Sequence, residues 1–305
     1  MRNGVINIYK ERGFTSHDVV AKLRGILKQK KIGHTGTLDP DAEGVLPVCL
    51  GSGTKLCDML TDRDKAYEAV LLLGQSTDTQ DTTGTVLQQA EVSVTEEMVR
   101  EAILSFVGPC EQIPPMYSAL KVNGKKLCDL ARAGQEVERK ARPVVIHAIE
   151  ILEIHIPRVR MSVSCSKGTY IRTLCHDIGE KLGCHGCMEK LLRTKSGQFL
   201  LKDSLRLSEV ERLRDEGRLE EAILPVDEMF TAFPKAALKA ESSRLGYNGN
   251  PFRKKDLNCS PDAPEGEIRV YDCGGVFIGI YGWHPEQHLY RPVKMFYQPP
   301  ANSSV

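Results

Sequence analysis

The chain has 305 residues and a formal net charge of +1, with 41% hydrophobic and 27% charged residues. This is the composition of an ordinary folded protein, and Gly and Pro are too few for a collagen-like or disordered chain. No run of about 18 uncharged apolar residues exists and the N-terminus lacks an apolar signal core, so we expect no membrane span and a cytoplasmic location. The ten cysteines are therefore expected to be free thiols.

Positive charge is unevenly distributed despite the near-neutral total. Residues 1–36 carry eight Lys and Arg against two Asp and Glu. A second basic cluster comprises Arg139, Lys140 and Arg142. Such clusters are often only solvated faces, but contacts with nucleic-acid phosphates also need them. The net charge therefore does not exclude a nucleic-acid partner.

In the first half of the chain the helix signals are clear and one region is irregular. A capping box at residues 15–18, followed by apolar residues at helical spacing, predicts an amphipathic helix over about 16–28. Five glycines and two prolines punctuate residues 32–54, so we expect a structured loop there in place of a regular strand. Residues 67–73 are typical of a central strand, and residues 95–107 of a capped helix.

The second half of the chain mixes strands and helices in blocks. Residues 144–156 and 158–166 predict two strands, and apolar residues at helical spacing predict a helix over 171–183. A capping box at residues 208–211 predicts a further helix. After about Pro225, short strands separated by Gly and Pro predict a small β-rich module. This order favours an α+β fold over a doubly wound sheet.

Several enzyme classes are disfavoured because their motifs are missing from the sequence. There is no GxxxxGK[ST], no strand–GxGxxG–helix unit, no HExxH and no GxSxG, which argues against NTP hydrolysis, dinucleotide redox chemistry and standard acyl transfer. Cys184 and Cys187 form a CxxC near Cys175, but no second CxxC completes a zinc site. Reduced, partly buried cysteines therefore explain this cluster better than a metal or redox centre does.

The segment GHTGTLDPDAEGVLPVCLGSGTKL at 33–56 carries the most information. Pro40 restricts Asp39 to an extended backbone, so a fixed loop either aims this carboxylate inward for chemistry or holds it in an Asx turn. The segment resembles the catalytic motif of the TruB-type tRNA pseudouridine synthases, which convert uridine 55 of the tRNA T-loop. The resemblance covers nearly the whole chain and continues in FTSHDVVAKLR at 14–24, DKAYEAVLLLGQSTDTQDTTG at 64–84, PPMYSALKVNGKKLCDLARAG at 114–134, KGTYIRTLCHDIGEKLG at 167–183 and LLRTKSGQF at 191–199.

The resemblance implies a domain organisation and a partner. It implies a catalytic domain at residues 1–225, with a mixed, largely antiparallel sheet and flanking helices, and a PUA-like RNA-binding domain at residues 226–305. An RNA-gripping insertion, the thumb, is expected at about 113–146. It further implies a monomer that acts on tRNA without a protein partner. No metal or other cofactor is expected, because moving uracil from N1 to C5 is neither a redox step nor one that needs outside energy.

The same resemblance assigns the catalytic residues. Asp39 is implied to be the nucleophile, which either forms a covalent intermediate or deprotonates the ribose. Arg172 is implied to pair with Asp39 and keep it ionised. Tyr67 is implied to contact the uracil face and to move a proton at C5.

Three further residues are implied to bind the substrate. The target uridine is stacked inside a folded RNA, so it has to be extruded before its glycosidic bond can react. His34 is implied to stack in the space that the uridine leaves. Tyr170 and Leu191 are implied to line the uridine pocket. Without the resemblance, these three would be an ordinary loop residue, helix-end residue and core residue.

Two other functions stay open. One is a tRNA-binding folding chaperone on the same scaffold, and the other is a guide-RNA-dependent, dyskerin-type pseudouridine synthase. The presence of Asp39, Tyr67 and Arg172 argues against a protein that has lost its activity. The sequence at 114–134 favours the stand-alone bacterial type over the guide-dependent one.

Overall fold

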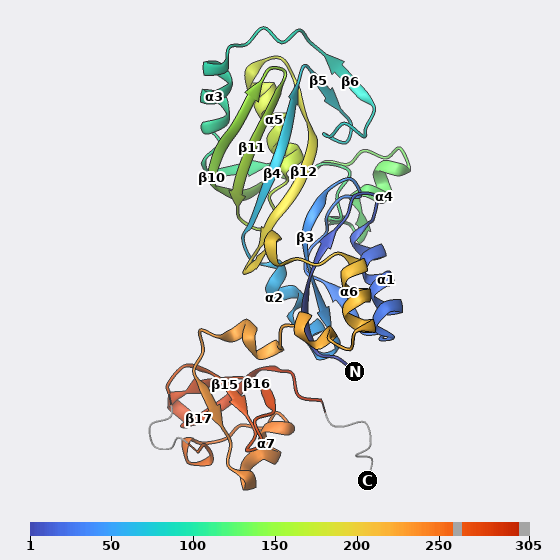
Figure 1. Ribbon diagram of the computed structural model, residues 1–305. Coiled ribbons are helices and arrows are strands. Elements are labelled where there is room, and N and C mark those ends of the chain that lie inside the picture. Colours follow the sequence, from blue (N-terminus) through green and yellow to red (C-terminus); the bar gives the residue numbers. More distant parts are fainter. Residues whose placement is uncertain (259–263, 299–305) are drawn as a thin grey trace.

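The computed structural model describes residues 1–258 and 264–298, and its elements form three groups along an elongated molecule (Figure 1). The upper two groups share a nine-stranded sheet in the order β1-β3-β12-β4-β11-β10-β7, to which β2 and β13 are attached. Its pairings are antiparallel, apart from the parallel pair of β3 and β12. This confirms the predicted α+β fold with a mixed, largely antiparallel sheet. The strands are β1 (Gly4–Lys10), β2 (Ile32–His34), β3 (Glu43–Leu50), β4 (Lys65–Leu73), β7 (Gly108–Gln112), β10 (Arg142–His155), β11 (Arg158–Cys165), β12 (Gly186–Ser196) and β13 (Phe199–Leu200).

Helices cover one face of this sheet in two places. The apolar sides of α3 and α5 pack on the buried side chains of β4 and β11, which alternate along each strand with partly exposed ones. Helices α1 and α6 pack on β1 and β3. The positions of the first and last residues follow from local signals, since Thr15 caps α1 and Gly183 ends α5 with a φ of +70°. The helices are α1 (Ser16–Leu27), α2 (Cys57–Thr61), α3 (Glu96–Leu104), α4 (Leu127–Arg132), α5 (Ile171–Leu182), α6 (Leu207–Asp215) and α7 (Ser243–Tyr247).

Most predicted elements are confirmed, but the loop expected over residues 32–54 and two helix ends differ from the prediction. Residues 32–54 contain the regular strand β3, which pairs with β1 and with β2, and the Pro47 carbonyl at its centre accepts a hydrogen bond from the Thr35 N–H. Helix α6 begins at Leu207, with its cap at Arg206, two residues before the predicted cap, because the Glu209 carboxylate accepts a hydrogen bond from the Arg206 N–H. Helix α3 ends at Leu104, three residues before the predicted end.

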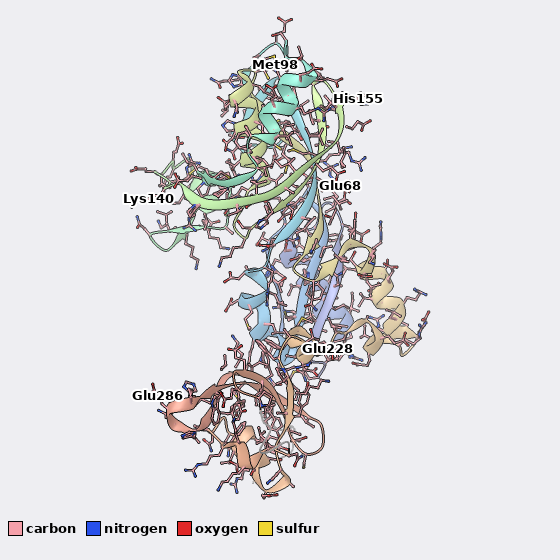
Figure 2. The ribbon with its side chains drawn as sticks, turned by 90° about the vertical axis from the view of Figure 1, so that its left-hand side faces the viewer. Glu68, Met98, Lys140, His155, Glu228 and Glu286 are labelled. Atoms are coloured by element: carbon pink, nitrogen blue, oxygen red, sulfur yellow. The ribbon has the colours of Figure 1, made fainter. Side chains whose placement is uncertain are left out.

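The segment between β7 and β10, residues 113–141, projects from the sheet and carries Lys140 at its edge (Figure 2). It contains the hairpin of β8 (Lys121–Val122) and β9 (Lys125–Lys126), followed by α4. We call residues 113–141 the thumb from here on. The predicted limit at residue 146 falls inside β10.

The third group of elements is a four-stranded sheet in the order β14-β15-β16-β17. The predicted short strands correspond to β15 and β16. A shared apolar cluster joins this sheet to the main one, with Phe230, Ile280 and Phe296 packed near Val45 and Cys49. The strands are β14 (Lys235–Ala237), β15 (Glu267–Tyr271), β16 (Phe277–His284) and β17 (Leu289–Met295).

Within the described residues, no helix is long and apolar enough to cross a membrane. Nine of the ten cysteines fall in the described part of the chain and are unpaired there. Cys175, Cys184 and Cys187 are buried. No group of three or more metal-ligating side chains is found over residues 1–258 and 264–298.

Candidate active site

Asp39 lies in the loop between β2 and β3, and neighbouring residues fix this loop from the α1 side. Leu38 is buried in the main core. Its N–H donates a 2.9 Å hydrogen bond to the hydroxyl of Ser16, at the start of α1. The position of Asp39 is therefore fixed on one side by the buried Leu38 and on the other by Pro40, which restricts the backbone of the residue before it.

Lys10, the last residue of β1, binds the loop of Asp39 from the β1 side. Its side chain is fully buried, and Nζ donates hydrogen bonds to the carbonyls of Pro40 at 3.0 Å and Ala42 at 2.5 Å. Burial lowers the pKa of Lys10 to about 8. Our sequence prediction missed this residue, although it continues the buried alternation of Ile6 and Ile8 along β1.

Arg172, in the first turn of α5, pairs with Asp39 through two nitrogens. Nε lies 3.1 Å from Oδ2 and Nη2 lies 3.4 Å from Oδ1, and the Arg172 side chain is 6% exposed. The other contacts of the guanidinium fix its plane, since it donates to the carbonyls of Thr79 at 3.0 Å and Tyr117 at 2.8 Å. The predicted pairing of Asp39 with Arg172 is present in the structure.

The electrostatics of Asp39 differ from the simple ion pair that the sequence suggested. Asp81, another residue the sequence prediction missed, has Oδ2 3.7 Å from Arg172 Nη1, so two carboxylates share one guanidinium. Burial and the nearby Asp81 raise the pKa of Asp39, while Arg172 and Lys10 lower it, and the pKa lies above its ordinary value. Arg172 thus opposes the effect of burial without reversing it.

Tyr67 lies on the helix-covered face of β4, directly opposite Arg193 of β12. Both side chains are buried, so the positive charge of the Arg193 guanidinium acts on the Tyr67 hydroxyl in a dry environment. Burial raises the pKa of Tyr67 and Arg193 lowers it, with the pKa remaining above the ordinary value. Arg193 Nε donates a 2.6 Å hydrogen bond to the carbonyl of Val45, which fixes the guanidinium against β3.

The three residues predicted to bind the substrate are His34, Tyr170 and Leu191. His34 ends β2, and burial lowers its pKa. Its Nδ1 accepts a 3.3 Å hydrogen bond from the Gly36 N–H, so the neutral ring carries its proton on Nε2. Tyr170 immediately precedes α5 and is partly buried. Leu191 is opposite Ala69 in β4, on the same face as Tyr67, and packs against the main core.

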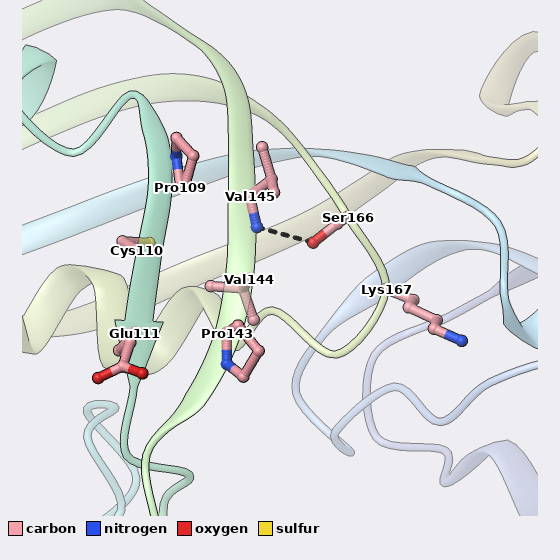
Figure 3. Close-up of a pocket in the computed structure, with 8 residues that line it drawn as sticks. All are labelled: Pro109, Cys110, Glu111, Pro143, Val144, Val145, Ser166 and Lys167. Atoms are coloured by element: carbon pink, nitrogen blue, oxygen red, sulfur yellow. Dashed lines mark hydrogen bonds between the residues drawn. The ribbon is translucent and has the colours of Figure 1, made fainter.

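A cavity lies at the edge of the sheet, between β7, β10 and the residues that follow β11 (Figure 3). Its volume is about 430 Å³, and Asp39 does not line it. The next residue after its β7 wall is Gln112, the last residue before the thumb. The lining residues are Pro109, Cys110, Glu111, Pro143, Val144, Val145, Ser166 and Lys167.

Comparison with known proteins gives consistent matches over most of the chain. Residues 24–171 match the model of the N-terminal domain of TruB family pseudouridylate synthases, and residues 172–231 match that of the tRNA pseudouridylate synthase B C-terminal domain. The tRNA pseudouridine synthase B of Lachnoclostridium phytofermentans is 55% identical over 96% of this chain and 99% of its own. That of Alkaliphilus oremlandii is 47% identical over 96% of this chain and 97% of its own.

The chain belongs to the TruB family of pseudouridylate synthases.

A solved structure supports the same fold for this TruB-family chain. A chain in the crystal structure of a Cbf5-Nop10-Gar1 complex superposes with a TM-score of 0.71 at 26% identity, covering 96% of this chain and 85% of that one. The two family models meet at residues 171 and 172, the start of α5, yet the strands on either side of that point form one sheet. The Asp39–Arg172 pair therefore joins the parts of the chain that the two models match.

Proposed function

We propose that this TruB-family protein isomerises uridine 55 in the T-loop of tRNA to pseudouridine. The observation that carries the proposal is the Asp39–Arg172 pair, a carboxylate on a fixed loop with a planar guanidinium bound to both of its oxygens. The relatives named tRNA pseudouridine synthase B support tRNA as the substrate.

Asp39 acts on the ribose of the target uridine in this proposal. As a nucleophile it forms a covalent intermediate, and as a base it removes a ribose proton; both roles require the ionised carboxylate. Its side chain is 38% exposed, so it stays accessible to a substrate while Arg172 is buried behind it. Arg172 therefore acts as the cation that opposes neutralisation of Asp39 as the site closes.

Tyr67 takes the role of the uracil contact. Its phenol is protonated at neutral pH, and burial raises its pKa further. In this proposal the phenol gives its proton to N1 of the detached uracil, and the phenolate so formed takes the proton from C5 once the C5–C1′ bond has formed. The positive charge of the nearby Arg193 stabilises the phenolate between these two transfers, since it lowers the pKa of Tyr67.

Extrusion and binding of the uridine fall to His34, Tyr170 and Leu191. The neutral His34 ring stacks in the space that the uridine leaves, and a neutral ring enters a base stack with a smaller desolvation cost than a charged one. Tyr170 and Leu191 close the pocket around the uracil. Their partial burial leaves part of each side chain free for such a contact.

In this proposal residues 1–225 form the catalytic domain. The thumb and a PUA-like domain at residues 226–305 bind the rest of the tRNA. Lys140 of the thumb and Arg142 at the start of β10 are exposed and suited to phosphates. The proposal needs no cofactor or protein partner, and it describes a monomer. An enzyme that modifies tRNA works where tRNA is, so we place it in the cytoplasm.

The test is to incubate the purified protein with an unmodified tRNA transcript and to map pseudouridine at nucleotide resolution. Modification of uridine 55 alone, with EDTA present and no other RNA, is the expected result. Activity that appears only with an added guide RNA would favour the dyskerin-type alternative. Accelerated tRNA folding without any pseudouridine would favour the chaperone alternative. Loss of activity in EDTA that zinc restores would point to the CxxC cluster.

A further inference from the structure

One side chain binds the root of the thumb, by which we mean residues 112–117, to the start of α5. Gln112, the last residue of β7, is 3% exposed. Its Oε1 accepts a 2.9 Å hydrogen bond from the Tyr170 N–H, and its Nε2 donates a 3.2 Å hydrogen bond to the Tyr170 carbonyl. The carboxamide thus occupies both main-chain groups of the residue that precedes α5.

Five residues further along the thumb, a second contact reaches the catalytic pair itself. The carbonyl of Tyr117 accepts a 2.8 Å hydrogen bond from Arg172 Nη2, the same nitrogen that lies 3.4 Å from Asp39. The segment between Gln112 and Tyr117 is therefore held at one end to the backbone before α5 and at the other to the guanidinium that α5 carries.

Because of these two contacts, the orientation of the Arg172 guanidinium toward Asp39 depends on the position of the thumb root. In the described structure the Tyr170 side chain makes no capping hydrogen bond at the N-terminus of α5. The Tyr170 N–H is bonded to Gln112, and its carbonyl accepts from Gln112 and, at 3.1 Å, from the Leu174 N–H inside the helix. If the carboxamide is lost, the Tyr170 N–H loses its partner and the carbonyl keeps only its bond from the Leu174 N–H, so the first turn of α5 can shift. A planar pair with two contacts tolerates little rotation before one of them is lost.

We propose that Gln112 is a positioning residue for the Asp39–Arg172 pair and that it couples the thumb to the chemical step. RNA that holds the thumb in place holds the first turn of α5 through Gln112, and so holds Arg172 against both oxygens of Asp39. This inference rests on the proposed function, because it assigns Gln112 a part in that reaction.

The coupling has a signature in the pH dependence of the reaction. In the intact protein, pairing with Arg172 lowers the pKa of Asp39. Loss of the Gln112 contacts weakens this pairing and leaves the other groups around Asp39 in place. The pKa of Asp39 then rises, and the acid limb of the pH–rate profile moves to higher pH. The titratable and charged groups that face Asp39 are Arg172 of α5, Lys10 of β1, Asp81 of the loop after β5 (Gln75–Thr77), Tyr67 of β4 and Tyr170 before α5.

The experiment measures single-turnover pseudouridine formation in the full-length protein, with saturating enzyme and a tRNA transcript, across pH 5 to 8. The main variant is Gln112→Leu, which keeps the approximate size of the side chain and removes both hydrogen bonds. The control is Ile149→Ala, a core truncation in β10 that destabilises the same sheet but removes no hydrogen bond at the start of α5, since an isoleucine side chain makes none. Each variant is studied below its own melting temperature, and its Kd for tRNA is measured in parallel.

For Gln112→Leu we expect the rate at pH 6 to fall about tenfold, the Kd for tRNA to change less than about threefold, and the acid limb to move upward by about half a pH unit or more. The Ile149→Ala limb should not move. An unmoved limb in a folded Gln112→Leu protein would overturn the inference, even if its rate were lower.

Two further outcomes are separated by design. If Gln112→Leu does not fold, Gln112→Met is measured in the same way, since its unbranched side chain has nearly the length of glutamine, carries no charge and lacks the amide that bonds Tyr170. A moved limb there supports the inference, and an unmoved one overturns it. If the wild-type protein makes no pseudouridine at all, the proposed function fails, which is distinguishable from a failure confined to Gln112.

Discussion

Gly44→Ala tests whether the junction of β3 and β12 holds the candidate site together. Gly44 is opposite Arg193 in the parallel pairing of these strands, and its φ is +106°. A Cβ atom there would lie 2.2 Å from the Arg193 carbonyl oxygen and 2.9 Å from its nitrogen. The strands would have to part by about 1 Å to reach ordinary van der Waals distance.

The expected loss of stability has two parts. The left-handed backbone costs an alanine roughly 1–3 kcal/mol, and weakening of the adjacent β3–β12 hydrogen bonds adds about 1 kcal/mol for each. We therefore expect Gly44→Ala to lower the free energy of unfolding by about 4 kcal/mol. Gly108→Ala is the matched control, because Gly108 has a φ of +115° and no neighbouring atom within 4 Å of its would-be Cβ. It should show the backbone cost alone.

Urea denaturation followed by circular dichroism measures both variants. Single-turnover rates at a temperature where both are folded should also fall further in Gly44→Ala, because Arg193 moves with β12 and its positive charge shifts relative to the Tyr67 hydroxyl. Equal losses of stability in the two variants would refute the reasoning, since they would show that β12 yields to the added methyl group without cost.

Two further predictions concern the tRNA. Neutralising Lys140 and Arg142 together should weaken tRNA binding and flatten its salt dependence by up to about one unit of log–log slope for each lost phosphate contact, and an unchanged slope would make them merely solvated. Arg139 is left intact because it donates a 3.1 Å hydrogen bond to the Pro114 carbonyl at the thumb root. His34→Ala should slow uridine extrusion more than Leu191→Ala does, since stacking contributes about 1–3 kcal/mol per base; stopped flow with a fluorescent base analogue beside the target would show the reverse order if these roles were exchanged.

Local signals in the sequence predicted most of the elements, because capping and periodicity depend on near neighbours. Thr15 and Gly183 mark helix ends through hydrogen bonds and dihedral angles within one turn. The same kind of signal failed for residues 32–54, where frequent Gly and Pro pointed to a loop. Strand β3 forms there because β1 and β2 pair with it on both edges, and spacing along one segment does not report such partners.

The candidate site was predicted in outline through the resemblance, and its supporting contacts were not. Asp39 and Arg172 are 133 positions apart, and no spacing rule brings them together. Asp81 and Lys10 were missed because their roles come from tertiary contacts with Arg172 and with the loop of Asp39. Gln112 looked like any polar residue near the end of a strand, and its buried carboxamide shows its use only beside the Tyr170 backbone.

The most direct test of the account is the single-turnover formation of pseudouridine by the wild-type protein and by Asp39→Asn, mapped along one unmodified tRNA. Asparagine keeps the size of the side chain and its hydrogen bonding but can act neither as a nucleophile nor as a base. We predict complete conversion of uridine 55 by the wild type and no detectable conversion by Asp39→Asn, with tRNA affinities that agree within about threefold. Retention of even about a tenth of the wild-type rate by Asp39→Asn would contradict the assignment of Asp39 as the reacting group.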